Sequence, residues 1–92
     1  MKRFLNLKTD NDNINLTLIR MQDYVSVNVI SIKYDFSIKY LIRVNNQKLI
    51  QSGINFANGC NFTVDSNILK DEENSNTIEV FEKGRLIATA MF

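Results

Sequence analysis

Cys60 is the chain's one cysteine and the first residue to consider as a nucleophile. It follows Asn58-Gly59 inside the alternating run I54-N-F-A-N-G-C-N-F-T-V64. The chain has no histidine, which excludes Cys-His and Ser-His-Asp arrangements and any metal site that needs an imidazole. The alternation places Cys60 on the apolar face of a β-hairpin, where a free thiol packs as a small hydrophobic side chain. We therefore predict a buried and unreactive cysteine.

Carboxylates are the other residues that could support acid–base or metal chemistry. Asp71, Glu72 and Glu73 stand side by side in the polar segment 65–76. Nothing around them predicts the apolar pocket that a catalytic carboxylate needs, so we interpret them as part of a solvated connection. The run D10-N-D-N13 shares some residues with a calcium loop but lacks its Gly and distal Glu, and turn formation explains it better. No glycine-rich phosphate-binding pattern occurs, and we expect no cofactor and no metal.

Basic side chains form a third candidate site. Lys33, Lys39 and Arg43 share the odd, outward phase of two consecutive predicted strands, together with Ser31 and Ser37. On a single sheet they would make a basic platform for nucleic acid. The aromatic residues that would stack on bases have the opposite phase, however. We interpret the lysines as ordinary solvated side chains and keep a weak nucleic-acid-binding surface as the alternative.

The spacing of apolar residues predicts the elements that carry these candidates. Alternation with a period of two runs through the chain, and no segment fits the helical pattern better. The apolar phase changes from odd positions at Val29 to even positions from Ile30, which indicates a bulge or a bend. The whole run is also too long for one strand of a small domain, so we divide it near residues 34–37. We predict strands at residues 2–7, 14–20, 24–33 and 37–44, with a loop at 9–13.

Two short loops predict hairpins in the second half of the chain. Asn45-Asn46 favours a two-residue turn because asparagine tolerates positive φ. Residues 82–84 favour a three-residue loop in which Gly84 is left-handed. The predicted pairs are Val44 with Gln47, Ile42 with Leu49, Val80 with Leu86, and Ile78 with Ala88.

The hairpin that contains Cys60 has two possible registers. A two-residue turn at Asn58-Gly59 would put apolar and polar residues on one face. A three-residue loop at 57–59, with Gly59 left-handed, pairs Phe56 with Cys60 and Ile54 with Phe62 and makes one coherent face. We predict the three-residue loop.

Short strands at regular spacing predict the fold class. Seven or eight of them in 92 residues indicate an all-β, immunoglobulin-like, two-sheet antiparallel β-sandwich, with a small β-barrel as the alternative. We expect a single domain over residues 1–92. No apolar run approaches the roughly 20 residues of a membrane span, so we expect a soluble protein. A net charge of +1 gives no general attraction to nucleic acid or membranes.

Three segments resemble a known family. Y40-L-I-R-V-N-N-Q-K-L-I50, then I68-L69 and N76-T-I-E-V80, are similar to the middle strands of immunoglobulin-like and fibronectin type III-like domains, which are common in bacterial and phage surface and tail proteins. The resemblance covers roughly residues 24–92. Paired cysteines, tryptophan and a glycine before N-T-I-E-V are missing here. The resemblance implies a scaffold rather than a particular chemistry.

These features together favour a non-catalytic protein that binds a larger protein partner. The Asn, Ile and Lys bias is typical of AT-rich phage or mobile-element genes, so we expect either a virion or surface subunit or an inhibitor of host defence such as an anti-CRISPR protein. We expect it in the host cytoplasm or on the virion, with homo-oligomers through edge strands as a further possibility. The candidate partner surface comprises Lys33, Lys39, Arg43, Asp71, Glu72 and Glu73.

Overall fold

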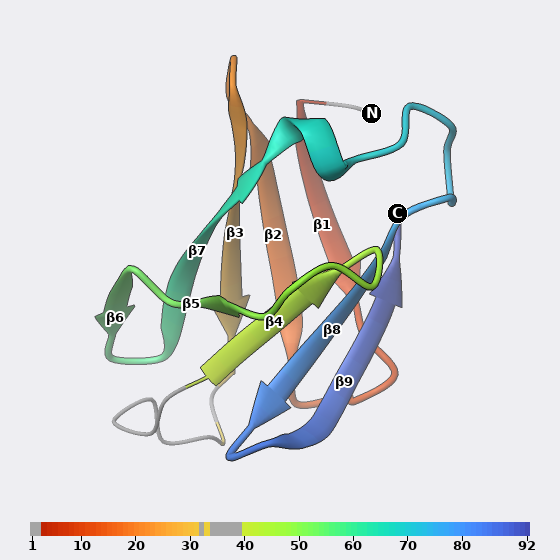
Figure 1. Ribbon diagram of the computed structural model, residues 1–92. Helices are drawn as coiled ribbons and strands as arrows, with labels where there is room; N and C mark the ends of the chain where they lie inside the picture. The colour runs from red at the N-terminus through yellow and green to blue at the C-terminus, as the bar shows by residue number, and fades with distance from the viewer. Residues whose placement is uncertain (1–2, 32, 34–39) are drawn as a thin grey trace.

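The described part of the chain forms two antiparallel sheets. A computed structural model describes residues 3–31, 33 and 40–92, and these form nine strands (Figure 1). The first sheet contains, in spatial order, β1 (Phe4–Lys8), β2 (Asn15–Arg20), β3 (Tyr24–Ile30), β7 (Gly59–Asp65) and β6 (Ile54–Phe56). The second contains β5 (Ile50–Gln51), β4 (Tyr40–Val44), β8 (Thr77–Glu82) and β9 (Arg85–Met91). A short 3-10 helix, Ser66–Ile68, follows β7, and these residues form no helix long and apolar enough to cross a membrane.

The predicted two-sheet sandwich is confirmed, with more strands than expected. Strands β2, β3, β7 and β6 face β4, β8 and β9, which is the strand order of the two sheets in constant-type immunoglobulin domains. Strand β1 extends the first sheet beyond β2, and β5 extends the second beyond β4. The chain therefore crosses between the sheets three times, after β3, β5 and β7.

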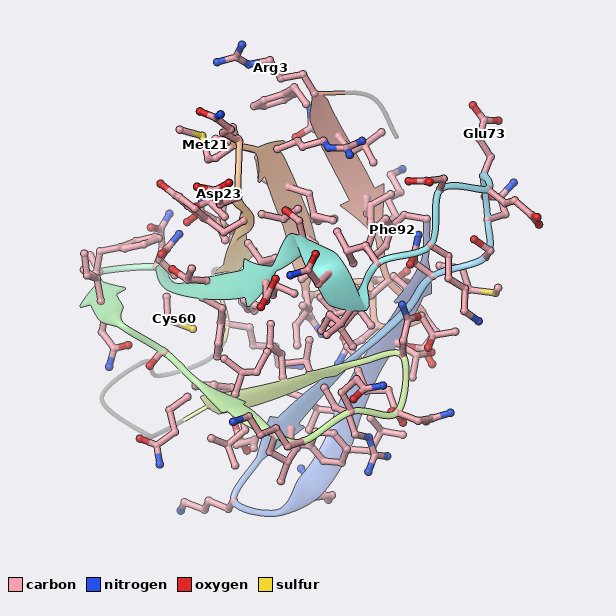
Figure 2. The ribbon with its side chains drawn as sticks, turned by 45° about the horizontal axis from the view of Figure 1, so that its top comes forward. Arg3, Met21, Asp23, Cys60, Glu73 and Phe92 are labelled. Carbon is pink, nitrogen blue, oxygen red and sulfur yellow. The ribbon has the colours of Figure 1, made fainter. Side chains whose placement is uncertain are left out.

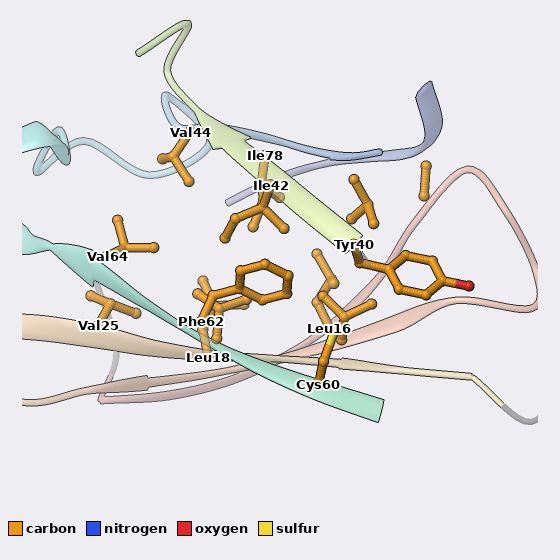
Figure 3. Packing of buried hydrophobic residues seen from close by; sticks show 14 of the residues in the cluster. Leu16, Leu18, Val25, Tyr40, Ile42, Val44, Cys60, Phe62, Val64 and Ile78 are labelled. Carbon is orange, nitrogen blue, oxygen red and sulfur yellow. The ribbon is translucent and has the colours of Figure 1, made fainter. Parts of the chain in front are cut away.

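Alternating side chains from both sheets fill the space between them. Val25, Val27 and Val29 of β3 face inward and are at most 1% exposed, as the sequence predicts. Figure 3 shows Phe62 between the two layers, with Ile42 and other residues of the second sheet on its far side. Full burial of an aliphatic or aromatic side chain contributes about 1.5–3 kcal/mol each. The interior is one cluster, which comprises Ile14, Leu16, Leu18, Val25, Val27, Val29, Tyr40, Ile42, Val44, Cys60, Phe62, Val64, Ile78, Val80, Ala88 and Phe92.

Strand β3 ends earlier than predicted. It stops at Ile30, and Ser31 is buried instead of facing outward. The Ser31 N–H donates to the Asn58 carbonyl at 2.9 Å, so the chain turns toward the β6–β7 hairpin. The next strand begins at Tyr40, and the part of its predicted range before that residue lies outside the described residues.

The predicted Asn45-Asn46 turn is confirmed, but the predicted register after it is wrong. Both asparagines have positive φ, 52° and 59°, and the Gln47 N–H donates to the Val44 carbonyl at 3.1 Å. Beyond the turn, Ile42 pairs with Ile50 rather than with Leu49. The shift lets Ile50 pack against the core and leaves Leu49 47% exposed.

The β6–β7 hairpin also differs from the prediction. Its turn is Ala57-Asn58, and Phe56 pairs with Gly59 rather than with Cys60, while Ile54 pairs with Asn61 rather than with Phe62. Gly59 is needed for close packing and not for positive φ. A Cβ there would lie 2.5 Å from the Phe56 ring and 2.5 Å from the Val29 carbonyl oxygen. Cys60 nevertheless keeps its place on the core face.

The predicted register of the β8–β9 hairpin is also wrong, because its turn is shorter than predicted. Lys83 adopts φ 51° and Gly84 φ 78°, so they form a two-residue turn flanked by Glu82 and Arg85. Further along the hairpin, Phe81 pairs with Leu86 and Val80 pairs with Ala88, so Ile87 is the extra residue of a β-bulge. The bulge thus lies inside β9 instead of at the turn. It pairs Val80 with Ala88 and Ile78 with Ala90 and leaves Leu86 46% exposed.

Candidate functional site

The described basic candidates do not form one platform. Lys33 is exposed just after β3 of the first sheet, whereas Arg43 is on β4 of the second, and Lys39 lies outside the described residues. The Arg43 Nε donates to the Glu79 carboxylate at 2.8 Å, and the guanidinium lies 5.2 Å from the centre of the Phe81 ring. The hydrogen bond to Glu79 raises the pKa of Arg43. The protein itself therefore neutralises this cation.

Cys60 is buried, as predicted. It is 1% exposed and lies on β7, where it pairs with Val29 of β3 and faces the interior (Figure 3). Desolvation raises the pKa of its thiol to about 12, so the thiolate that a nucleophile needs is not populated near neutral pH.

Turn formation at residues 10–13 is confirmed, and the loop also contacts the second sheet. The Asn13 N–H donates to the Asn11 side-chain oxygen at 3.0 Å, as in an Asx turn. The Asp10 carboxylate accepts hydrogen bonds from the N–H and the hydroxyl of Thr89, at 2.7 and 3.0 Å, and the Asp10 N–H donates to the Thr89 carbonyl at 3.0 Å. The Asn11 amide donates to the Ile87 carbonyl at 3.0 Å. This loop therefore covers the outer edge of β9.

Asn76, which the sequence analysis did not single out, fixes the acidic loop. Its side chain is 1% exposed and accepts hydrogen bonds from the Lys70 N–H and the Asn45 amide, both at 2.8 Å. The Asn76 amide donates to the Lys70 carbonyl at 2.9 Å, which closes residues 70–76 into a loop. Its backbone pairs with Phe92 through two hydrogen bonds of 3.0 Å. The loop that carries Asp71, Glu72 and Glu73 is thus held beside the C-terminal end of β9.

A groove lies where this loop meets the edges of both sheets. Leu5 and Leu7 of β1 line it together with Met91 and Phe92 at the end of β9, and Glu72, Glu73 and Asn74 line it from the loop. Its volume is about 200 Å³. Figure 1 shows the loop on the same side of the sandwich as β1 and the end of β9, and Figure 2 shows Glu73 extending from it into solvent. The groove combines an apolar lining with two carboxylates.

The backbone of β9 is open at this groove. Because Asn76 and Phe92 form a hydrogen-bonded pair, alternation along an antiparallel ladder directs the N–H and C=O of Met91 away from β8. Met91 has the same phase as Thr89, whose N–H and C=O are bound by Asp10. Its side chain is 56% exposed.

The sequence identified half of this groove. It predicted Glu72 and Glu73 as exposed loop residues, and the structure places both in the groove while Asp71 is exposed on the same loop. The apolar half comes from the two ends of the chain, which no local pattern brings together. The one usable signal is that Leu5 and Leu7 have the inward phase of a predicted edge strand.

Comparison of the chain with protein-family models, curated proteins and solved structures finds no match in any of the three. The resemblance to immunoglobulin-like and fibronectin type III-like domains therefore stays a prediction.

Proposed function

We propose that this protein is a non-catalytic, protein-binding β-sandwich and that the groove between β1 and β9 is its binding surface. The observation that carries the proposal is the combination of an apolar lining with Glu72 and Glu73 on a loop anchored by a buried Asn76. At about 200 Å³ the groove is smaller than the about 300–1,000 Å³ of sites for small molecules. It suits one or two side chains of a partner protein better.

Three side chains that could take part in chemistry are buried or already paired within the protein, which supports a non-catalytic function. The Cys60 thiol is buried, and burial raises its pKa to about 12. The Asp10 carboxylate is bound by Thr89, and Arg43 is paired with Glu79.

The same surface serves either of the roles that composition suggests. A virion or surface subunit would use the groove to assemble with a larger component. A soluble inhibitor, such as an anti-CRISPR protein, would use it to occlude a host protein. The phage or mobile-element origin and the compartment, host cytoplasm or virion, stay predictions.

Charge reversal at the groove tests the proposal. Glu72→Lys/Glu73→Lys and a matched control, Asp12→Lys/Asp23→Lys, make the same change in net charge, and all four residues are exposed. In affinity capture from host lysate, we expect one protein to co-purify with wild type and the control and to be lost with the groove variant. Capture of the same proteins by all three forms would contradict the proposal.

The nucleic-acid alternative predicts a different result. Phosphate binding releases counterions, so retention on DNA or RNA would fall steeply with added salt and would depend on Lys33 and Lys39. Arg43 contributes less to such a surface because Glu79 already binds it. Absence of retention at low salt would dismiss this alternative.

A further inference from the structure

We propose that the outer edge of β1 binds an extended segment of the partner as an added β-strand, and that this segment places apolar side chains in the groove and a Lys or Arg beside Glu72 and Glu73. The inference rests on the proposed function and specifies how the groove is used. Edge strands with free backbone groups bind peptides in this way, through main-chain hydrogen bonds and pockets for alternate side chains.

The backbone of β1 has the required geometry. Phe4–Lys8 is the outermost strand of the first sheet. The Arg20 N–H donates to the Arg3 carbonyl at 2.7 Å, so Arg3 and Arg20 are a hydrogen-bonded pair. Alternation from that pair directs the backbone groups of Leu5 and Leu7 toward β2 and those of Phe4, Asn6 and Lys8 toward the open edge.

Among the edges of the described sandwich, β1 offers the longest open row. Strands β5 and β6 have two and three residues. Strand β9 has seven, but Asp10 and Asn11 bind its edge at Thr89 and Ile87. Loop 9–13 thus covers β9, while β1 stays open over five residues.

The groove determines which side chains the added strand presents. A strand beside β1 would direct every second side chain to the face of Leu5 and Leu7, which line the groove with Met91 and Phe92. Two such apolar side chains would cover the exposed Met91.

Charge complementarity specifies the remaining side chain. The groove is lined by two carboxylates and by no cation among the described residues. A third inward-facing position of the added strand would therefore be occupied best by Lys or Arg. A second copy of this chain fits less well, because the groove-facing side chains of its own β1 are Leu5 and Leu7, which bring no charge.

Blocked hexapeptides test this mode directly. The probes are Val-Thr-Val-Thr-Lys-Thr and Lys-Thr-Val-Thr-Val-Thr, which cover both strand directions, and the same peptides with Glu in place of Lys. NMR with amide hydrogen exchange should show about tenfold or greater protection at Phe4, Asn6 and Lys8 with a saturating Lys peptide, and no change at Leu5 and Leu7. The Lys peptides should bind roughly fivefold more tightly than the Glu peptides at low salt. Glu72→Gln/Glu73→Gln should abolish that preference and keep the alternating protection.

Two substitutions at one position separate backbone from side-chain effects. Asn6→Pro removes an outward N–H that β2 does not use, which edge strands tolerate, and should abolish peptide binding while the circular dichroism spectrum is kept. Asn6→Ala loses the side chain, which accepts a 3.2 Å hydrogen bond from Thr17, but keeps the N–H and should bind normally.

The outcomes separate this inference from the proposed function. Absence of protection with millimolar peptide, or uniform protection along β1, would overturn strand addition. Concentration-dependent protection without peptide would also overturn it, since a second copy would then occupy the edge. If the inference fails while capture of a partner still depends on Glu72 and Glu73, the groove binds protein in another way. If charge reversal leaves capture unchanged, the proposed function itself fails.

Discussion

Thr89 and Met91 lie two residues apart on the same edge of β9, yet the edge is closed at one and open at the other. Loop 9–13 closes it at Thr89, where Asp10 binds both the N–H and the C=O. At Met91 the loop 70–76 stands beside the edge and leaves a groove. Natural sandwiches protect edge strands with loops of this kind, and a segment left unprotected is a place for a partner. One edge strand can therefore be covered for stability at one residue, Thr89, and left open for binding two residues later, at Met91.

The largest expected effect is the difference in reagent access between a thiol in the interior, at Cys60, and a thiol on the open edge of β9, at position 91. Cys60 is 1% exposed and Met91 is 56% exposed. A bulky thiol reagent should label native Cys60 at least about 1,000-fold more slowly than the denatured chain, because reaction requires unfolding. Met91→Cys in a Cys60→Ala background should react at the rate of a free thiol. Fast native labelling of Cys60, in protein shown to be folded, would contradict the sandwich packing.

The same thiol predicts how stability depends on pH. Burial raises the pKa of Cys60 from 9.0 to about 12, so the folded state disfavours the thiolate. The unfolded chain loses this proton first, and the free energy of unfolding should therefore fall as the pH rises from about 9 toward 12. Cys60→Ala should lose this part of the pH dependence. Chemical denaturation at pH 7, 9 and 10 compares the two proteins.

Among the residues that form the groove, Asn76 should have the largest effect on the free energy of unfolding. Asn76→Ala removes three hydrogen bonds and leaves polar groups of Lys70 and Asn45 without this partner. We expect a loss of about 2–4 kcal/mol in the free energy of unfolding. Asn67→Ala, on the exposed surface of the same connection, should change it by less than about 0.5 kcal/mol. Equal effects of the two substitutions would show that Asn76 does not anchor the loop.

Asp10 covers the edge of β9 at Thr89, and its substitution should have a smaller effect on the free energy of unfolding. Asp10→Ala removes both side-chain hydrogen bonds to Thr89, which are exposed to solvent, and should cost about 1–2 kcal/mol in urea denaturation. The Thr89 amide should then exchange its hydrogen faster. Asp10→Asn keeps one acceptor and should give an intermediate value. If Thr89 exchange is unchanged in Asp10→Ala, something other than Asp10 protects this edge.

The smallest effect is expected on the outer face of the second sheet. Glu79→Gln should change the thermal midpoint by no more than a few degrees, since a partly exposed ion pair adds little stability. Retention on a DNA column at low salt should increase because Arg43 is released. Equal retention of Glu79→Gln and wild type would show that the ion pair with Glu79 does not weaken DNA binding by Arg43.

The sequence predicts the layers of this fold better than its turns. Alternation at Val25, Val27 and Val29 fixes which face is buried, because side chains on a strand alternate strictly. Turn lengths depend on individual residues. Lys83 takes positive φ without being glycine or asparagine, and Gly59 serves close packing against Phe56, so both loops were predicted one residue too long.

The candidate site could be predicted only in part, for a similar reason. Exposed Glu72 and Glu73 follow from local polarity. Their proximity to Leu5 and Leu7 depends on how the chain ends meet, which rests on the hydrogen bonds of Asn76 and is not encoded by a local period.

Amide hydrogen exchange on the free protein tests the contrast between the closed and open edge most directly. We expect slow exchange at Thr89, Leu5 and Leu7, and exchange at least about tenfold faster at Met91, Asn6 and Lys8. Protection of Met91 and Asn6 equal to that of Thr89 would contradict it, because neither β9 nor β1 would then present an open edge.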